Sequence, residues 1–323
     1  MVDIEALRSV DRRALAQAIT LLESTRKEHR TDAEELLHQV MPYTGNSIRI
    51  GITGVPGVGK STFIEAFGNR ITEQGHQVAV LTIDPTSSFS GGSILGDKTR
   101  METLATNPRA YIRPSPSGQT LGGVARRTHE AILVCEAAAF DVIIVETVGV
   151  GQSETLVAAM TDIFLLMLLP AAGDELQGIK RGIMELADIV IVNKSDGDLV
   201  KHASVAASDI KHALNLVKRR LPAWQVPVVA VSSIEGSGID AVQEKIDAYR
   251  ELLEMDGTLQ TRRKQQARQW LWNETREQLL AELKHDRSVD AALEGVLQQV
   301  SDGELPASIA ARKLVETFLG SKK

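Results

Sequence analysis

The middle of the chain, residues 47–233, alternates short apolar runs with stretches that are long enough to form helices. Most of the apolar runs are continuous rather than alternating, which is typical of strands buried on both faces of a parallel sheet. The stretches between them supply the crossovers that parallel strands need. Seven strands are predicted, at residues 47–54, 77–84, 110–114, 140–146, 162–169, 188–193 and 226–233. We therefore expect a three-layer α/β/α fold with a mostly parallel sheet, which binds its ligand beyond the carboxyl ends of the strands.

The two flanking segments show helical periodicity and no strand pattern. Residues 1–45 contain two stretches with apolar side chains at helical spacing, and residues 257–323 contain long amphipathic stretches. Such helices need a covering surface, either from the sheet domain or from a second subunit. We expect a helical N-terminal extension at 1–45, an α/β domain at 46–256 and a helical extension at 257–323 that forms a homodimer.

Composition excludes several classes of protein. A net charge of −6 over 323 residues argues against a general nucleic-acid binder, which needs a basic face. The single cysteine, Cys135, excludes an internal disulfide and favours a reducing, cytoplasmic location. The first residues lack the apolar segment of a signal peptide, and the longest apolar run, 163–172, is too short to cross a bilayer. No membrane insertion is expected.

Residues 54–62 read GVPGVGKST and follow the first predicted strand directly. They match G-x-x-x-x-G-K-[ST], in which glycines let backbone amides point inward around phosphate groups. The helix that follows adds the partial positive charge of its N-terminus. The phosphate-binding residues are then Gly54, Val55, Pro56, Gly57, Val58, Gly59, Lys60, Ser61 and Thr62. Lys60 is expected to reach the β- and γ-phosphates and Ser61 to bind Mg²⁺, as in a P-loop NTPase.

A second motif, Asn193-Lys194-Ser195-Asp196, ends the sixth predicted strand. One carboxylate, that of Asp196, accepts hydrogen bonds from both N1–H and the 2-amino group of guanine, whereas adenine offers a lone pair there. Asn193 suits N7 and the loop backbone, and the stem of Lys194 can lie along the base. The motif also has an ordinary explanation, since Asn, Ser and Asp are common in turns. Ser232, Ser233 and Ile234, at the end of the next strand, are expected to close the guanine pocket.

Three acids lie where Mg²⁺ bound to phosphates needs oxygen ligands, either directly or through water. Asp84 and Glu146 end predicted strands, and Asp97 follows the loop after Asp84. A charge that closes a buried strand needs a partner, which favours the metal interpretation for Asp84 and Glu146. For Asp97 the alternative is that it caps the helix that begins after it. The expected metal ligands are Ser61, Asp84, Asp97 and Glu146.

Several long motifs occur together in one order: GVPGVGKST, DPTSS, GDKTR, RPSPSGQTLGGVARRT, ETVGVGQSE and NKSD. In this the chain resembles the MeaB/ArgK family of P-loop GTPases, of the SIMIBI class. The resemblance covers most of the chain. It implies a metallochaperone-like G protein that hydrolyses GTP to GDP and phosphate and that is commonly a homodimer. The implied partner is an adenosylcobalamin-dependent acyl-CoA mutase, chiefly methylmalonyl-CoA mutase, which the G protein protects and whose cofactor loading it gates.

The resemblance also implies which residues respond to the nucleotide. The segment after Glu146 is switch II, and residues 173–183, with Lys180, form another mobile switch. Gln152 lies in the right loop to orient water, although it is equally suited to start a helix. The catalytic set is then Lys60, Glu146, Gln152 and Lys180. Because none of these is a strong general base, intrinsic hydrolysis is expected to be slow.

Other functions are left open or disfavoured by particular residues. An older label for the family is a kinase or ATPase of lysine/arginine/ornithine transport, which the NKSD motif does not favour. A nickel-insertion GTPase needs a Cys/His cluster, and a membrane-targeting GTPase needs a methionine-rich groove; the sequence suggests neither. The basic stretch RRKQQAR at 262–268 is interpreted as a solvated helix face, and His129 as an exposed helix residue.

Overall fold

The structure is a computed structural model that describes residues 2–26, 28–83, 101–115, 121–147, 153–170, 181–217, 219–255 and 257–321. Two compact units are present, Met1–Arg263 and Lys264–Lys323. The three-part division expected from the sequence, with boundaries at residues 45 and 256, stays a prediction.

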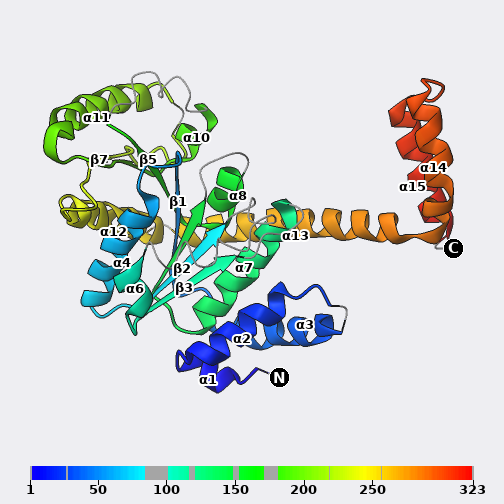
Figure 1. Ribbon diagram of the computed structural model, residues 1–323, viewed down its shortest axis with the longest axis horizontal. Coiled ribbons are helices and arrows are strands. Elements are labelled where there is room, and N and C mark those ends of the chain that lie inside the picture. The colour runs from blue at the N-terminus through cyan, green and yellow to red at the C-terminus, as the bar shows by residue number, and fades with distance from the viewer. Residues whose placement is uncertain are drawn as a thin grey trace. The chain divides into compact units, whose positions relative to one another are not determined.

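Seven parallel strands form one sheet in the first unit, in the order β3-β2-β4-β1-β5-β6-β7 (Figure 1). They are β1 Ile48–Gly54, β2 Val78–Ile83, β3 Ala110–Ser115, β4 Val142–Thr147, β5 Ile163–Leu168, β6 Ile189–Val192 and β7 Val228–Ala230. The seven expected strands are confirmed, and β1, β2, β4, β5 and β6 are buried along their whole length. Strands β2, β3 and β4 lie on one side of β1, and β5, β6 and β7 lie on the other. The direction in which strands are added to the sheet therefore reverses at β1, and a ligand is expected at its carboxyl end.

Helices cover both faces of the sheet and complete the three layers (Figure 1). Ile48 and Ile50 of β1 face a core shared with α4 and α12, whereas Arg49 between them faces α7. The first face carries α4 Lys60–Glu73, α6 Glu102–Thr106 and α12 Ile239–Met255. The second carries α7 Leu121–Ala137, α8 Ser153–Met160, α10 Arg181–Leu186 and α11 Val200–Leu214. Short 3₁₀ helices occur at Met41–Tyr43 and Gly197–Leu199.

Three N-terminal helices pack on this second layer. They are α1 Ile4–Arg8, α2 Arg12–Glu23 and α3 His29–Val40, and α2 and α3 contact α7. Arg12 donates from Nη2 to the backbone oxygens of Asn107 and Ala110, the latter at 2.6 Å. Arg113 of β3 pairs with Glu23. The N-terminal helices are therefore fixed to the edge strand β3 as well as to α7.

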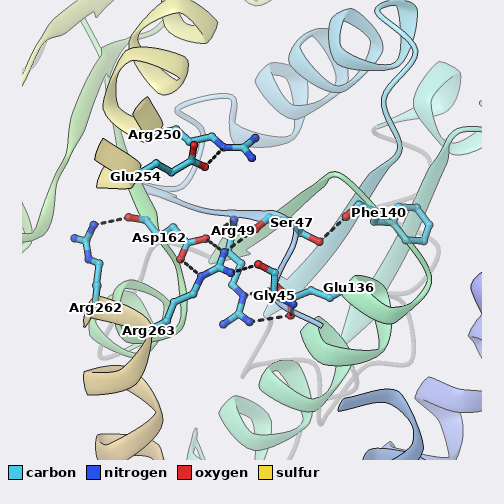
Figure 2. A network of polar contacts seen from close by, with 10 residues as sticks. All are labelled: Gly45, Ser47, Arg49, Glu136, Phe140, Asp162, Arg250, Glu254, Arg262 and Arg263. Atoms are coloured by element: carbon cyan, nitrogen blue, oxygen red, sulfur yellow. Dashed lines mark hydrogen bonds and ion pairs between the residues drawn. The ribbon is translucent and has the colours of Figure 1, made fainter. Parts of the chain in front are cut away.

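A network of charged side chains closes the amino edge of the sheet (Figure 2). Arg49 donates from Nε and Nη2 to the two carboxylate oxygens of Glu136, at 2.8 and 2.9 Å. Arg263 makes the same forked contact with Asp162, at 2.8 and 2.6 Å, and also donates to the backbone oxygen of Ser47. Asp162 accepts the backbone N–H of Arg49 at 2.9 Å. These contacts fasten the first turns of α13 (Thr258–His285) to the sheet.

A second buried acid, Asp188, directly precedes β6 at the same edge. It accepts the hydroxyl of Tyr249 at 2.6 Å and lies 3.5 Å from Nη2 of Arg262. The side chains of Arg262 and Arg263 are only 11% and 16% exposed. The expectation of a solvated basic face is therefore wrong for these two residues, because they meet acids that are distant along the chain, a proximity that local pattern does not reveal.

His129 of α7 also differs from its expected environment. The ring is half-buried rather than exposed. Burial, together with the positive charge of Arg49, lowers the pKa of His129 from 6.5 to about 4. The side chain is therefore a neutral imidazole in the folded protein at neutral pH.

The second unit contains the remainder of α13 with α14 (Arg287–Ser301) and α15 (Ala307–Ser321). Asp286 caps α14 by accepting the backbone N–H of Ser288 at 3.0 Å, and Ser321 donates to its other oxygen at 2.9 Å. Several large apolar side chains of this unit are exposed, among them Leu271, Trp272, Leu279, Leu297 and Leu319. Across the described parts of both units, no helix has the length and apolar character of a membrane span.

Candidate nucleotide site

The carboxyl end of β1 turns through residues 55–59 into α4, which is the strand, loop and helix that the GVPGVGKST motif predicts. Gly59 is the N-cap of α4 and has a φ of 91°, in the left-handed region that favours glycine. A Cβ atom at Gly59 would lie 2.7 Å from Nδ2 of Asn193, and one at Gly54 would lie 2.5 Å from the backbone oxygen of Met167. Both glycines are therefore required by close approach of the neighbouring strands.

The phosphate-loop side chains differ in exposure. Val58 is fully buried, whereas Pro56 is exposed and Val55 is intermediate. Lys60 is 7% exposed, and its Nζ donates to the backbone oxygen of Gly54 at 2.8 Å and to that of Val55 at 3.3 Å. The ammonium group thus folds back over the loop, where it adds its charge to that of the α4 N-terminus. The arrangement suits a polyphosphate anion.

Ser61 and Glu146 come together from different elements. β4 pairs with β1 so that Glu146 is the partner of Ile52, and Ser61 Oγ donates to Glu146 Oε1 at 3.3 Å. Glu146 is 7% exposed. A hydroxyl and a carboxylate beside a phosphate loop are the oxygen donors that Mg²⁺ prefers, so these two residues fit the ion. Within the described ranges no group of three His, Cys, Asp or Glu side chains is placed to hold a metal.

Asn193 joins the base loop to the phosphate loop. It is 2% exposed, and its Nδ2 donates to the backbone oxygen of Val58 at 2.8 Å. Its Oδ1 accepts the hydroxyl of Ser233 at 2.7 Å and the backbone N–H of Ser233 at 3.3 Å. The Asn193 side chain was expected to contact both N7 of the base and loop backbone, and the structure shows the contact with loop backbone.

Asp196 is held by Ser232, whose Oγ donates to Asp196 Oδ2 at 2.5 Å. Ser232 is fully buried and also accepts the backbone N–H of Glu235 at 3.1 Å. Lys194 is exposed and has a φ of 59°, and Ile234, in the loop after β7, is 81% exposed. Ser232, expected to close the guanine pocket, orients the carboxylate that is expected to read the base.

Sequence reasoning missed a buried hydroxyl pair beneath the site. Thr53 and Thr147 are each 1% exposed, and their Oγ1 atoms lie 2.8 Å apart. Because Ile52 pairs with Glu146, the next residues of β1 and β4 also face each other. The register between β1 and β4 is the signal that identifies this pair. That register depends on how the two strands pair, which neither sequence motif shows by itself. The pair ties the end of β1 to the end of β4.

Four of the predicted site residues lie outside the described residues. They are Asp84, Asp97, Gln152 and Lys180. Their expected functions as metal ligands, water-orienting residue and nucleotide-responsive residue remain predictions. The described residues bring together the phosphate loop, Ser61 with Glu146, and the Asn193–Asp196 loop.

Comparison with known proteins agrees with this arrangement. Residues 15–288 match the family model described as "Methylmalonyl Co-A mutase-associated GTPase MeaB". A relative from Escherichia coli K12 named GTPase ArgK is 45% identical, over 97% of this chain and 95% of the relative. A mouse relative named "Methylmalonic aciduria type A homolog, mitochondrial" is 44% identical, over 95% of this chain and 76% of the relative. A crystal structure of a protein named "LAO/AO transport system kinase" superposes with a TM-score of 0.78 at 39% identity, covering 97% of this chain and 95% of its own.

Proposed function

Because the chain belongs to the MeaB family of GTPases, we propose that it protects an adenosylcobalamin-dependent methylmalonyl-CoA mutase and gates the loading of its cofactor in response to guanine nucleotide. One observation carries the nucleotide part: Asn193 is bonded to the phosphate loop while Asp196, three positions later, is held by Ser232. The residues proposed to bind phosphate and to read the base thus lie at one edge of the sheet. A carboxylate at that edge favours guanine over adenine, because it accepts from N1–H and from the 2-amino group.

In the proposed reaction the chain's own residues position charge around the triphosphate of GTP. The Lys60 ammonium and the amides of the phosphate loop stabilise the negative charge that builds on the phosphate oxygens as water attacks. Ser61 and Glu146, with Asp84 and Asp97, would hold Mg²⁺, which neutralises charge on the β- and γ-phosphates when bound. Gln152 would orient the water and Lys180 would respond to the nucleotide. Because Gln152 is a weak base, we expect slow hydrolysis that a partner accelerates.

The names of relatives support the mutase as partner. The family description refers to methylmalonyl-CoA mutase, and the mouse relative is named for methylmalonic aciduria. The test is binding of purified methylmalonyl-CoA mutase to the full chain, loaded with GDP or with a non-hydrolysable GTP analogue. We expect a complex whose dissociation constant depends on the nucleotide. The same affinity in both states, or no complex in either, would contradict the gating function.

A second candidate is the kinase or ATPase of lysine/arginine/ornithine transport, which is favoured by the name of the protein in the similar crystal structure. The two functions differ in the base that is bound. Competition of ATP against a fluorescent GDP analogue separates them cheaply, since the proposed site excludes adenine. Displacement by ATP at concentrations similar to those of GTP would favour the transport-linked enzyme.

We also propose a cytoplasmic homodimer formed by the helical region 257–323. The exposed apolar side chains of the second unit support this, because a helix with uncovered Leu and Trp side chains gains stability from a second surface. Trp272 is 72% exposed and is the largest of these side chains. Light scattering of the wild-type chain and of Trp272→Glu tests the proposal. A monomeric wild type, or a variant that stays dimeric, would contradict it.

A further inference from the structure

Strands β1 and β4 pair along most of their length and separate at the carboxyl edge of the sheet. The last residues that pair between them are Ile52 and Glu146. Beyond this point β1 continues beside β5 through Thr53 and Gly54, whereas β4 continues beside β2 through Thr147. The phosphate loop leaves the end of β1, and the Glu146 carboxylate lies near the end of β4. The two parts of the expected metal site are therefore carried by strands that separate at this edge.

A pair of threonine hydroxyls joins the two strands where their backbone pairing ends. The Oγ1 atoms of Thr53 and Thr147 lie 2.8 Å apart, and each residue is 1% exposed. Because water does not compete for these hydroxyls, their hydrogen bond is stronger than one at the surface. The pair therefore extends the link between β1 and β4 by one position beyond the last backbone pair.

The hydroxyl pair and the Glu146 carboxylate lie on opposite faces of the sheet. Side chains alternate along a strand, so Glu146 faces the layer of α4 and Thr147 faces the layer of α8. Thr53 faces the same layer as Gly51, where a Cβ atom would lie 2.8 Å from Cγ1 of Val157 in α8. The pair is thus buried on the α8 side of the sheet, and any effect on the metal site passes through the strand ends.

Burial alone does not explain why hydroxyls occupy this position. Ile143 and Val145 face the same layer from β4, and both are fully buried apolar residues. Replacing both members of a buried hydrogen-bonded pair by apolar residues of the same shape costs little stability. What two threonines add is a bond of fixed length and direction between the strand ends.

We propose that Thr53 and Thr147 are positioning residues for Mg²⁺-dependent nucleotide binding, because their hydroxyl pair fixes the separation of the phosphate loop from Glu146. Ser61 Oγ donates to Glu146 Oε1 across that separation at 3.3 Å. Mg²⁺ demands near-ideal distances to its oxygen ligands, so a small shift of one strand end weakens a site that draws on both. The inference rests on the proposed function, because it requires that Mg²⁺ strengthens guanine-nucleotide binding.

The experiment measures the Mg²⁺ concentration that half-saturates tight binding of a fluorescent GTP analogue to the full chain. In Thr53→Val and in Thr147→Val we expect this midpoint to rise about 2- to 5-fold, the effect of one lost hydrogen bond. Affinity for the analogue without Mg²⁺ is expected to change by less than about 2-fold, since the residues of the phosphate loop are unchanged.

Two further variants separate the hydroxyl pair from packing. Thr147→Ser keeps the hydroxyl and loses a buried methyl group, so it should keep the wild-type midpoint while its stability to urea falls. The double variant, Thr53→Val with Thr147→Val, leaves no hydroxyl of the pair without its partner. Its stability should therefore exceed that of either single valine variant, while its Mg²⁺ midpoint stays raised.

Thr128→Val is the matched control. Thr128 of α7 is also 1% exposed, and its hydroxyl donates to the backbone oxygen of Val124 in the same helix at 2.9 Å. This variant loses an equally buried hydroxyl that joins no strands, so we expect it to keep the wild-type midpoint. Urea denaturation shows that each variant is folded and ranks their stabilities.

The outcomes distinguish the inference from the function on which it rests. If wild type responds to Mg²⁺ while the folded valine variants share its midpoint, the pair serves stability alone and the inference is overturned. A midpoint that recovers in the double variant, or that rises as much in Thr147→Ser, follows stability and also overturns it. If the nucleotide affinity of wild type does not respond to Mg²⁺, the proposed metal site is wrong and the inference falls with it. A midpoint that rises only where the hydroxyl pair is lost supports both.

Discussion

At the amino edge of the sheet Arg49, Asp162 and Arg263 bond to partners within the chain through forked contacts of 2.6 to 2.9 Å. At the carboxyl edge the corresponding contact between Ser61 and Glu146 is single and 3.3 Å long. The forked contacts at the amino edge join opposite charges within the fold, and the hydroxyl and carboxylate at the carboxyl edge are oxygen groups of the kind that Mg²⁺ prefers. The two edges of the sheet therefore differ in function: contacts at the amino edge stabilise the fold, and residues at the carboxyl edge suit a nucleotide.

This division predicts that substitutions at the two edges separate stability from binding. A change at the amino edge should lower the free energy of unfolding and leave nucleotide affinity as it is. A change at the carboxyl edge should do the reverse. Four substitutions test the division, beginning with the largest expected effect.

Arg263→Ala leaves the buried Asp162 carboxylate without its forked partner, so we expect the free energy of unfolding to fall by about 3–5 kcal/mol. Urea denaturation measures the change. The matched control is Arg250→Ala, which removes a half-exposed pair with Glu254 one helical turn away and should cost about 0.5 kcal/mol or less. Equal losses in the two variants would show that the amino-edge network has no special importance for stability.

His129 gives the amino edge a dependence on pH. Its folded pKa of about 4 lies below the ordinary 6.5, so between these values the unfolded chain binds a proton that the folded chain does not. Stability therefore falls as pH falls from 6.5 to 4, by up to about 3 kcal/mol from this group. His129→Gln should flatten that part of the curve, while the exposed His202→Gln should leave it unchanged. Parallel curves for His129→Gln and wild type would refute the assignment.

Lys60→Ala removes the ammonium group that lies over the phosphate loop. We expect GTP affinity to fall by about 100-fold, because charge-assisted bonds to phosphate are lost. Calorimetric titration measures the affinity, and denaturation should show a change in stability smaller than that of Arg263→Ala. Normal nucleotide turnover in this variant would contradict the phosphate-loop assignment.

Ser232→Ala removes the hydroxyl that holds Asp196. The carboxylate remains but loses one orienting bond, so GTP affinity should fall by about 5-fold with no change in the preference for guanine over adenine. Competition between GTP and ATP measures both quantities. A larger loss than that of Lys60→Ala would mean that Ser232 contacts the nucleotide directly.

The fold was predictable because the strands have a strong local pattern. The run VIIVE, for example, is apolar enough to be buried on both faces, and β4 spans Val142–Thr147 as a central strand. The phosphate loop was equally predictable, since its glycines and Lys60 lie together in the sequence. Asn193 and Asp196 were found for the same reason.

What the sequence does not reveal are contacts between distant residues. Arg263 lies 101 positions from Asp162, and Thr103 lies 38 positions from Glu65. The local sequence indicates neither contact, because polar residues have the same spacing on a helix face that meets a buried acid as on a face that meets water. The contact of Asn193 with Val58 likewise depends on β1 and β6 ending at the same edge of the sheet.

The central claim is that the carboxyl edge reads guanine through Asp196. The most direct measurement compares GTP and XTP affinities of wild type and Asp196→Asn. The new amide donates to the C2 carbonyl of xanthine but no longer accepts from the 2-amino group of guanine, so GTP affinity should fall about 100-fold while XTP affinity rises. An Asp196→Asn variant that still prefers GTP to the same degree as wild type would show that the base is read elsewhere.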